Sequence, residues 1–239
     1  FPQHVPSAGV FATLSIWITS DKASSGTITM ANGAFNASFN ILANGLQEIQ
    51  VPYSVAHISN AESGTIIQKS IKIKVDAGKP PVVAYAQQWG QARSAATLLL
   101  PVMVLGKKYR AISFTQNGAD GSGQIAKSQF QIIAVKPNTQ VRVTPVLNGV
   151  SGTPFTINFT NAGDIYQYQA DQDVTGSLIE SIATGSGSCL PIAVFSGSSN
   201  NTLGSLSCSG GSYDPLFQQL YPISSWGKNF GFIPFGDYP

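Results

Sequence analysis

Apolar and polar residues alternate along most of the chain with a period of two residues. Residues 14–19 read Leu-Ser-Ile-Trp-Ile-Thr, and segments 35–41, 70–76 and 155–160 alternate in the same way. This alternation is typical of strands that cover a core with one face and meet water with the other. Asn-Gly pairs, such as the one at 148–149, separate the runs and predict turns. The pattern predicts an all-β protein.

Parts of the first half of the chain recur in the second half, in the same order. The matched segments are 64–67 with 176–179, 81–85 with 191–195, and 101–109 with 222–230. The matched segments lie more than 100 residues apart. Solenoid repeats span about 20–50 residues, so a repeat of this length is a small domain. We therefore expect two tandem antiparallel β-sandwich modules related by internal duplication.

The expected module boundaries follow from a polar, glycine-rich loop at residues 116–123. Module 1 is predicted over residues 1–118 and module 2 over residues 124–239. Residues 109–114 are expected to form the last strand of module 1.

The composition excludes several classes of partner. Hydrophobic residues make up 43% of the chain, but charged residues make up only 10%, against about 25% in an average soluble domain. The net charge is +2 and the basic residues are scattered, so the clustered footprint of a nucleic-acid-binding protein is missing. No apolar run approaches the roughly 18 residues of a membrane span. We expect no nucleic-acid partner and no direct membrane insertion.

The two cysteines, Cys189 and Cys208, are interpreted as a structural disulfide, with a redox or metal-binding pair as the alternative. A disulfide closing this loop contributes about 3 kcal/mol in the chain-entropy model and indicates an oxidising compartment. Asn-x-Ser/Thr triplets support that compartment by predicting glycosylation at three positions: Asn36, Asn158 and Asn200.

Catalytic motifs are not found in the sequence. His4 and His57 have no nucleophile or metal partner suggested by spacing, and neither a Gly-x-Ser-x-Gly nor a His-Glu-x-x-His motif occurs. Asp164, Asp171 and Asp173 are weak calcium candidates that can equally be ordinary turn residues. We expect no enzyme activity, no cofactor and no metal.

Exposed aromatic residues are the best candidates for ligand binding. Trp89 is expected in a polar loop beside Arg93, a composition found in binding hot spots and suited to stacking on a sugar. The alternative is a loop anchor folded onto the sandwich. Tyr166 and Tyr168 would extend the platform of a carbohydrate-binding module, and Trp17 lies on the polar side of its alternation.

The chain also resembles a known family, and the likeness spans nearly its whole length, including residues 100–101 and 105–109 of the first module. The segments that carry the likeness are 163–167, 173–177, 191–197 (Pro-Ile-Ala-Val-Phe-Ser-Gly), 218–222 (Gln-Gln-Leu-Tyr-Pro) and 226–228 (Trp-Gly-Lys). Together they resemble the IgGFc-binding protein N-terminal domain family. The resemblance implies an extracellular, non-catalytic module of larger secreted or cell-surface proteins, associated with adhesion, mucus or host–microbe contact. It does not imply binding of Fc.

Three functions remain open on this basis. The first is a binding or adhesion module for a protein or glycan ligand at a cell surface or in mucus. The second is a carbohydrate-binding module, and the third is a passive structural spacer in a surface stalk.

Overall fold

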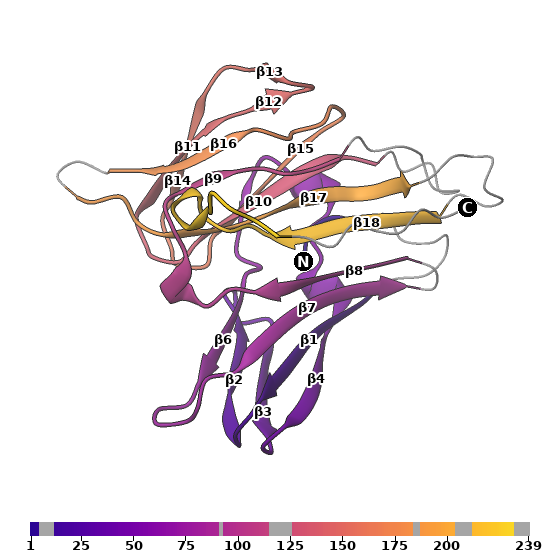
Figure 1. The fold of residues 1–239 in the computed structure, drawn as a ribbon, viewed down its shortest axis with the longest axis vertical. Helices are drawn as coiled ribbons and strands as arrows, with labels where there is room; N and C mark the ends of the chain where they lie inside the picture. Colours follow the sequence, from indigo (N-terminus) through magenta and orange to yellow (C-terminus); the bar gives the residue numbers. More distant parts are fainter. Residues whose placement is uncertain (5–11, 91–92, 115–125, 184–186, 204–211, 232–239) are drawn as a thin grey trace.

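A computed structural model describes residues 1–4, 12–90, 93–114, 126–183, 187–203 and 212–231 (Figure 1). Within these residues the chain is built mainly of β-strands. The first half holds β1 (Thr13–Ser20), β2 (Ser24–Met30), β3 (Asn36–Ile41), β4 (Gly45–Val51), β5 (Ile66–Ile67), β6 (Ile71–Val75), β7 (Val83–Gly90), β8 (Arg93–Leu99) and β9 (Lys108–Arg110). The second half holds β10 (Ser128–Ala134), β11 (Thr139–Thr144), β12 (Val146–Leu147), β13 (Val150–Ser151), β14 (Phe155–Phe159), β15 (Ile165–Ala170), β16 (Leu178–Ile182), β17 (Ile192–Leu203) and β18 (Ser212–Gln219). Short helical turns are α1 (Tyr53–Ala56), η1 (Asn60–Glu62), η2 (Val102–Val104) and η3 (Ile223–Ser225).

The strands of the described residues form four main sheets and one small hairpin. Sheet I has the order β4-β1-β7-β8 and sheet II the order β3-β2-β6. Sheet III has the order β18-β17-β10-β15-β5, sheet IV the order β14-β11-β16-β9, and β12 pairs with β13. Every strand pair among the described residues is antiparallel. The prediction of an all-β, antiparallel protein is confirmed.

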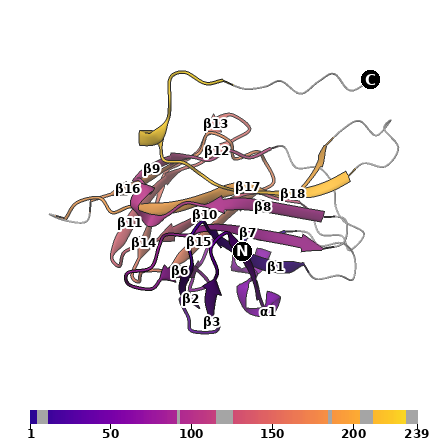
Figure 2. The same cartoon turned by 60° about the horizontal axis from the view of Figure 1, so that its bottom comes forward.

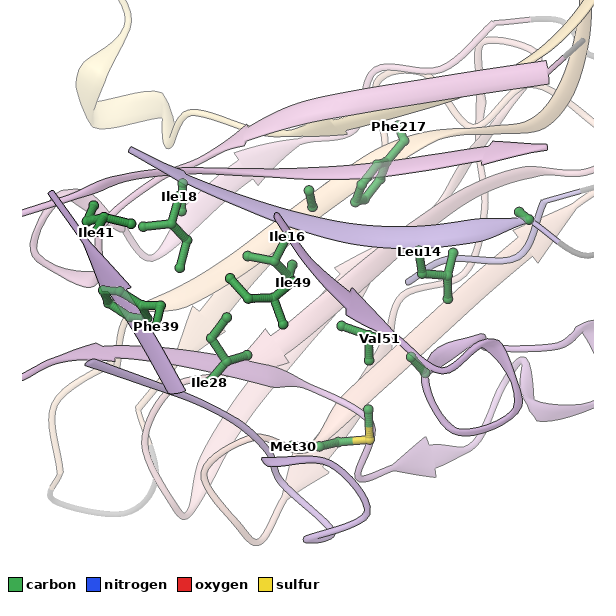
Figure 3. Close-up of a cluster of buried hydrophobic side chains, with 14 residues drawn as sticks. Leu14, Ile16, Ile18, Ile28, Met30, Phe39, Ile41, Ile49, Val51 and Phe217 are labelled. Carbon is green, nitrogen blue, oxygen red and sulfur yellow. The ribbon is translucent and has the colours of Figure 1, made fainter. Parts of the chain in front are cut away.

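The first hydrophobic core lies between sheets I and II (Figure 3). The period-two alternation produces it, because every second residue of a strand points to the same face. Leu14, Ile16 and Ile18 of β1 are almost completely buried and pack with Ile28 and Phe39 from sheet II.

A second core lies between sheets III and IV. Phe130 and Ile132 of β10 are fully buried, as are Val141 and Val143 of the facing strand β11. Burying a large aliphatic side chain contributes about 1.5–3 kcal/mol, so each core stabilises the two sheets that enclose it.

The two halves have the same strand order in corresponding sheets. The order β4-β1-β7-β8 in sheet I corresponds to β15-β10-β17-β18 in sheet III. The order β3-β2-β6 in sheet II likewise corresponds to β14-β11-β16 in sheet IV. One matched segment does not follow this correspondence. Residues 64–67 contain β5, which pairs with β15, whereas residues 176–179 lead into β16.

Two strands from the first half of the chain complete sheets of the second half. β9, expected to close module 1, instead pairs with β16 at the edge of sheet IV. β5 pairs with β15 at the edge of sheet III. The side chain of Tyr109 in β9 is fully buried in the second core. A strand joins the sheet in which its apolar side chain can be buried, even when the other strands of that sheet are distant in the sequence.

Sheets I and III also meet along β8 and β18, which lie side by side in Figures 1 and 2. Hydrogen bonds between the two halves fix this contact. The amide of Leu100 donates to Gln219 Oε1 at 2.8 Å, and the amide of Gln219 donates to Thr97 Oγ1 at 2.8 Å.

The hairpin between β12 and β13 shows how a turn signal is realised. Asn148 and Gly149 both have positive φ, at 48° and 81°. A two-residue type I′ turn requires this conformation, and the Asn-Gly pair adopts it at low cost. The predicted turn at this position is confirmed.

Candidate functional site

Three aromatic residues lie on the outward face of sheet I, and we call Trp17, Tyr85 and Trp89 the aromatic face. Trp17 on β1 stands directly opposite Tyr85 on β7, and Trp89 lies four residues further along β7. All three side chains point away from the first core, because they alternate with buried residues along β1 and β7. The strand register therefore brings together rings that are far apart in the sequence.

The rings of the aromatic face are accessible from solvent. Trp89 is 45% exposed and Tyr85 is 42% exposed, while Trp17 is partly exposed. The polar residues around Trp89 predict a loop, but the structure places Trp89 within β7. Tyr85 was missed altogether. The run Val-Ala-Tyr-Ala at residues 83–86 alternates large outward with small inward residues, and this signal could have found it.

Hydrogen bonds between polar side chains hold the aromatic face in place. The indole Nε1 of Trp17 donates to Gln87 Oε1 at 2.8 Å. Ser15 donates its hydroxyl hydrogen to Glu48 Oε1 at 2.6 Å. These bonds restrict the rotamers of the residues around the rings, so less side-chain entropy is lost when a ligand binds.

The aromatic face carries almost no charge. The outward residues of sheet I, all within the described part of the chain, contain one ionisable acid, Glu48, and no lysine or arginine. These residues are Leu46, Glu48 and Gln50 on β4, Thr13, Ser15, Trp17 and Thr19 on β1, Val83, Tyr85, Gln87 and Trp89 on β7, and Ser94, Ala96 and Leu98 on β8.

A cleft borders the aromatic face where β8 meets β18. Its volume is about 550 Å³, within the range of about 300–1,000 Å³ that is usual for ligand pockets. Ser94 and Ala96 line the cleft and also belong to the outward side of sheet I. Gln218 and Leu216 of β18 line its other wall. The cleft thus continues the aromatic face toward sheet III.

Three predicted ligand-binding residues lie elsewhere. Trp89 pairs with Ser94, and Gly90 pairs with Arg93, in the register of β7 and β8. The side chain of Arg93 therefore lies on the opposite face of sheet I from that of Trp89. Tyr166 and Tyr168 pack against the second core. The ring of Tyr168 stacks on Phe130 with centroids 4.9 Å apart, and burial raises the pKa of both tyrosines. They do not share a surface with Trp89.

The three aspartates proposed as calcium candidates do not converge on one point. Asp164 is buried and accepts hydrogen bonds from the amides of Thr160 and Asn161, which stabilises the turn before β15. Asp171 pairs with Lys127, and Asp173 accepts from the amide of Thr175. No group of three His, Cys, Asp or Glu side chains that could hold a metal occurs within the described residues.

The predicted disulfide and glycosylation positions differ in their surroundings. Cys189 is a partly exposed free cysteine, and Cys208 lies outside the described residues. Asn36 and Asn158 are exposed on β3 and β14. Asn200 on β17 is fully buried, an environment that does not suit a surface glycan.

A cluster of titratable rings lies between the two halves of the chain. His4 is 3% exposed, and its ring centroid lies 5.0 Å from that of His57. Tyr53 stacks on His57 with centroids 4.4 Å apart. Burial lowers the pKa of His4 to about 4 and that of His57 to about 3, so both imidazoles are neutral at neutral pH.

A second group of exposed apolar residues surrounds the turns η2 and η3. Met103 is 88% exposed, Phe230 is 80% exposed, and Tyr221 and Trp226 are each 53% exposed. Trp226 is the C-cap residue that follows η3. Gly106 contacts Pro222, so the two turns are neighbours.

The fold defines a class, that of all-β proteins built from several antiparallel sheets. The family model described as IgGFc binding protein matches residues 95–239, more than half of the chain, and the chain belongs to this family. It is a family of binding domains whose members are typically extracellular. No curated protein and no solved structure matches the chain. No helix among the described residues is long and apolar enough to cross a membrane.

Proposed function

We propose that this chain is a non-catalytic binding or adhesion module of a larger secreted or cell-surface protein. Membership of a family of extracellular binding domains supports this function. The observation that carries it is the aromatic face. Aromatic side chains exposed together on a sheet are typical of binding surfaces, since they supply large contact areas at little entropic cost. Protein and glycan ligands at a cell surface or in mucus are the partners we consider.

We further propose that the two halves are duplicated β-sandwich modules, with residues 1–118 and 124–239 as their sequence limits. The matching strand orders of sheets I and III, and of sheets II and IV, support this proposal. The crossing of β9 into sheet IV implies that the modules do not fold independently, because module 2 requires Tyr109 for its core.

An array experiment tests the proposed function. The purified chain is applied to immobilised glycans, mucins, immunoglobulin G and matrix proteins. We expect saturable binding to at least one of them, and weaker binding when Trp89 is replaced by alanine. Binding to none of these probes would contradict the proposal and favour the passive spacer.

A further inference from the structure

We infer that the aromatic face binds an extended, neutral saccharide chain, an inference that rests on the binding function proposed above. The spacing of the rings is the first argument. Tyr85 and Trp89 lie four residues apart on one strand, which is about 13–14 Å at 3.4 Å per residue. Trp17 lies on the neighbouring strand, about 5 Å across the sheet from Tyr85. The distance from Tyr85 to Trp89 is long enough to span more than one sugar ring.

The chemistry of the face suits pyranose rings. One side of such a ring presents C–H groups, which are attracted to the electron-rich face of tryptophan or tyrosine. The ring hydroxyls need hydrogen-bond partners in the same plane. Gln87 lies between Tyr85 and Trp89, and its Nε2 has no hydrogen-bond partner among the described residues. Gln50 and Glu48 supply further donors and acceptors on β4.

The charge of the face distinguishes a neutral saccharide from an acidic one. Glu48 is the one charged residue among the outward residues of sheet I. Binding a polyanion requires lysine or arginine to offset its charge. A uronate chain or a sulfated glycan would meet a carboxylate and no cation there, whereas a neutral chain would meet rings and amides.

The adjoining cleft extends the path available to the ligand. Ser94 and Ala96 belong both to the outward side of sheet I and to the wall of the cleft of about 550 Å³. Ser94 stands opposite Trp89 in the register of β7 and β8. A chain that stacks on Trp89 can therefore continue past Ser94 into the cleft, where Gln218 provides an amide.

The test is calorimetric titration of the full chain with neutral hexasaccharides of glucose, mannose, xylose and N-acetylglucosamine. A hexameric uronate is the charged comparison. We expect saturable binding of at least one neutral hexasaccharide and none of the uronate. Trp89→Ala and Tyr85→Ala should each weaken binding about tenfold or more. Trp89→Phe should recover most of the affinity, because it keeps an aromatic ring.

Trp226→Ala and Tyr221→Ala are matched controls, because both residues are 53% exposed and lie outside the aromatic face. They should leave affinity within about twofold of the unchanged protein. Urea unfolding of each variant establishes that the fold is retained. Trp17 is not substituted, because the loss of its hydrogen bond to Gln87 would also release Gln87 and change the rest of the aromatic face.

Two results would overturn the inference. One is failure of every neutral hexasaccharide to bind, and the other is binding that Trp89→Ala and Tyr85→Ala leave unaltered. If a protein on the array binds, loses affinity with Trp89→Ala, and no saccharide binds, then the proposed function stands and the saccharide inference fails. If neither saccharide nor protein binds, both fail.

Discussion

Tyr109 donates its hydroxyl hydrogen to the carbonyl oxygen of Ile192 at 2.8 Å, although 83 residues separate them. The same hydroxyl oxygen accepts a hydrogen bond from the amide of Gly106, also at 2.8 Å. Because Tyr109 lies on β9 and Ile192 begins β17, this side chain links the edge of sheet IV to sheet III. It joins a strand from the first half of the sequence to the core of the second half.

Replacing Tyr109 by phenylalanine should therefore destabilise the protein. The ring remains in the core, but the amide of Gly106 and the carbonyl of Ile192 lose their buried partner. We expect a loss of about 1–3 kcal/mol in the free energy of unfolding, measured by urea denaturation. Tyr85→Phe is the control, since Tyr85 is 42% exposed and should change stability by less than about 0.5 kcal/mol. Equal effects of the two variants would contradict the assigned role.

Gly26 on β2 should not tolerate even a methyl group. A Cβ atom at this position would meet the carbonyl oxygen of Lys74 on β6 and the ring of Phe39 on β3. Gly26→Ala should therefore cost about 1–3 kcal/mol through overpacking, again measured by urea denaturation. Gly231→Ala is the matched control, because no atom lies within 4 Å of its Cβ position. A neutral Gly26→Ala would contradict this prediction, because it would require both the Lys74 carbonyl and the Phe39 ring to move without cost.

Mild acid should destabilise the fold through His4 and His57. Both histidines have a lower pKa in the folded protein, about 4 and about 3, than the ordinary 6.5. Below pH 6.5 the unfolded chain takes up protons that the folded chain does not, so stability falls as the pH falls. We expect a loss of up to about 2 kcal/mol per histidine between pH 6.5 and 5.

Urea unfolding at several pH values measures this effect. The window above pH 5 avoids the titration of Glu62 and Glu180, whose carboxyl pKa values are lowered. Burial also lowers the pKa of the Phe1 amino group to about 5, so this group adds to the pH dependence, and a histidine variant is needed to separate the contributions. His57→Phe keeps a ring beside Tyr53 and removes one titrating group, so its stability should depend less on pH. The same pH dependence in this variant and in the unchanged protein would refute the assignment to His57.

The predicted disulfide between Cys189 and Cys208 can be tested by alkylation. Protein secreted into an oxidising medium should resist labelling of both cysteines until it is reduced. Cys189→Ser should then lower stability by about 3 kcal/mol. Labelling of Cys189 in the native, unreduced protein would contradict the predicted disulfide.

Local sequence was sufficient for some of the strands and for one of the turns. The alternation in residues 14–19 is a property of neighbouring residues, and it marks β1 and its buried face correctly. The Asn148-Gly149 turn was equally readable, because its signal is the intrinsic backbone preference of two residues. Trp89 was misplaced in a loop because glutamines and a glycine surround it. On a sheet whose outer face meets water, polar neighbours do not end a strand.

The sequence by itself determined that the chain is an antiparallel all-β protein of the IgGFc binding protein family. Both conclusions were possible because period-two alternation and family motifs depend only on residues that are close together in the sequence. Only the tertiary structure decided that β9 joins sheet IV, and that Trp17 and Tyr85 stand side by side. Those relationships depend on which strands pair across long separations. Pairing is settled by the burial of side chains such as Tyr109 in a shared core and not by any local pattern.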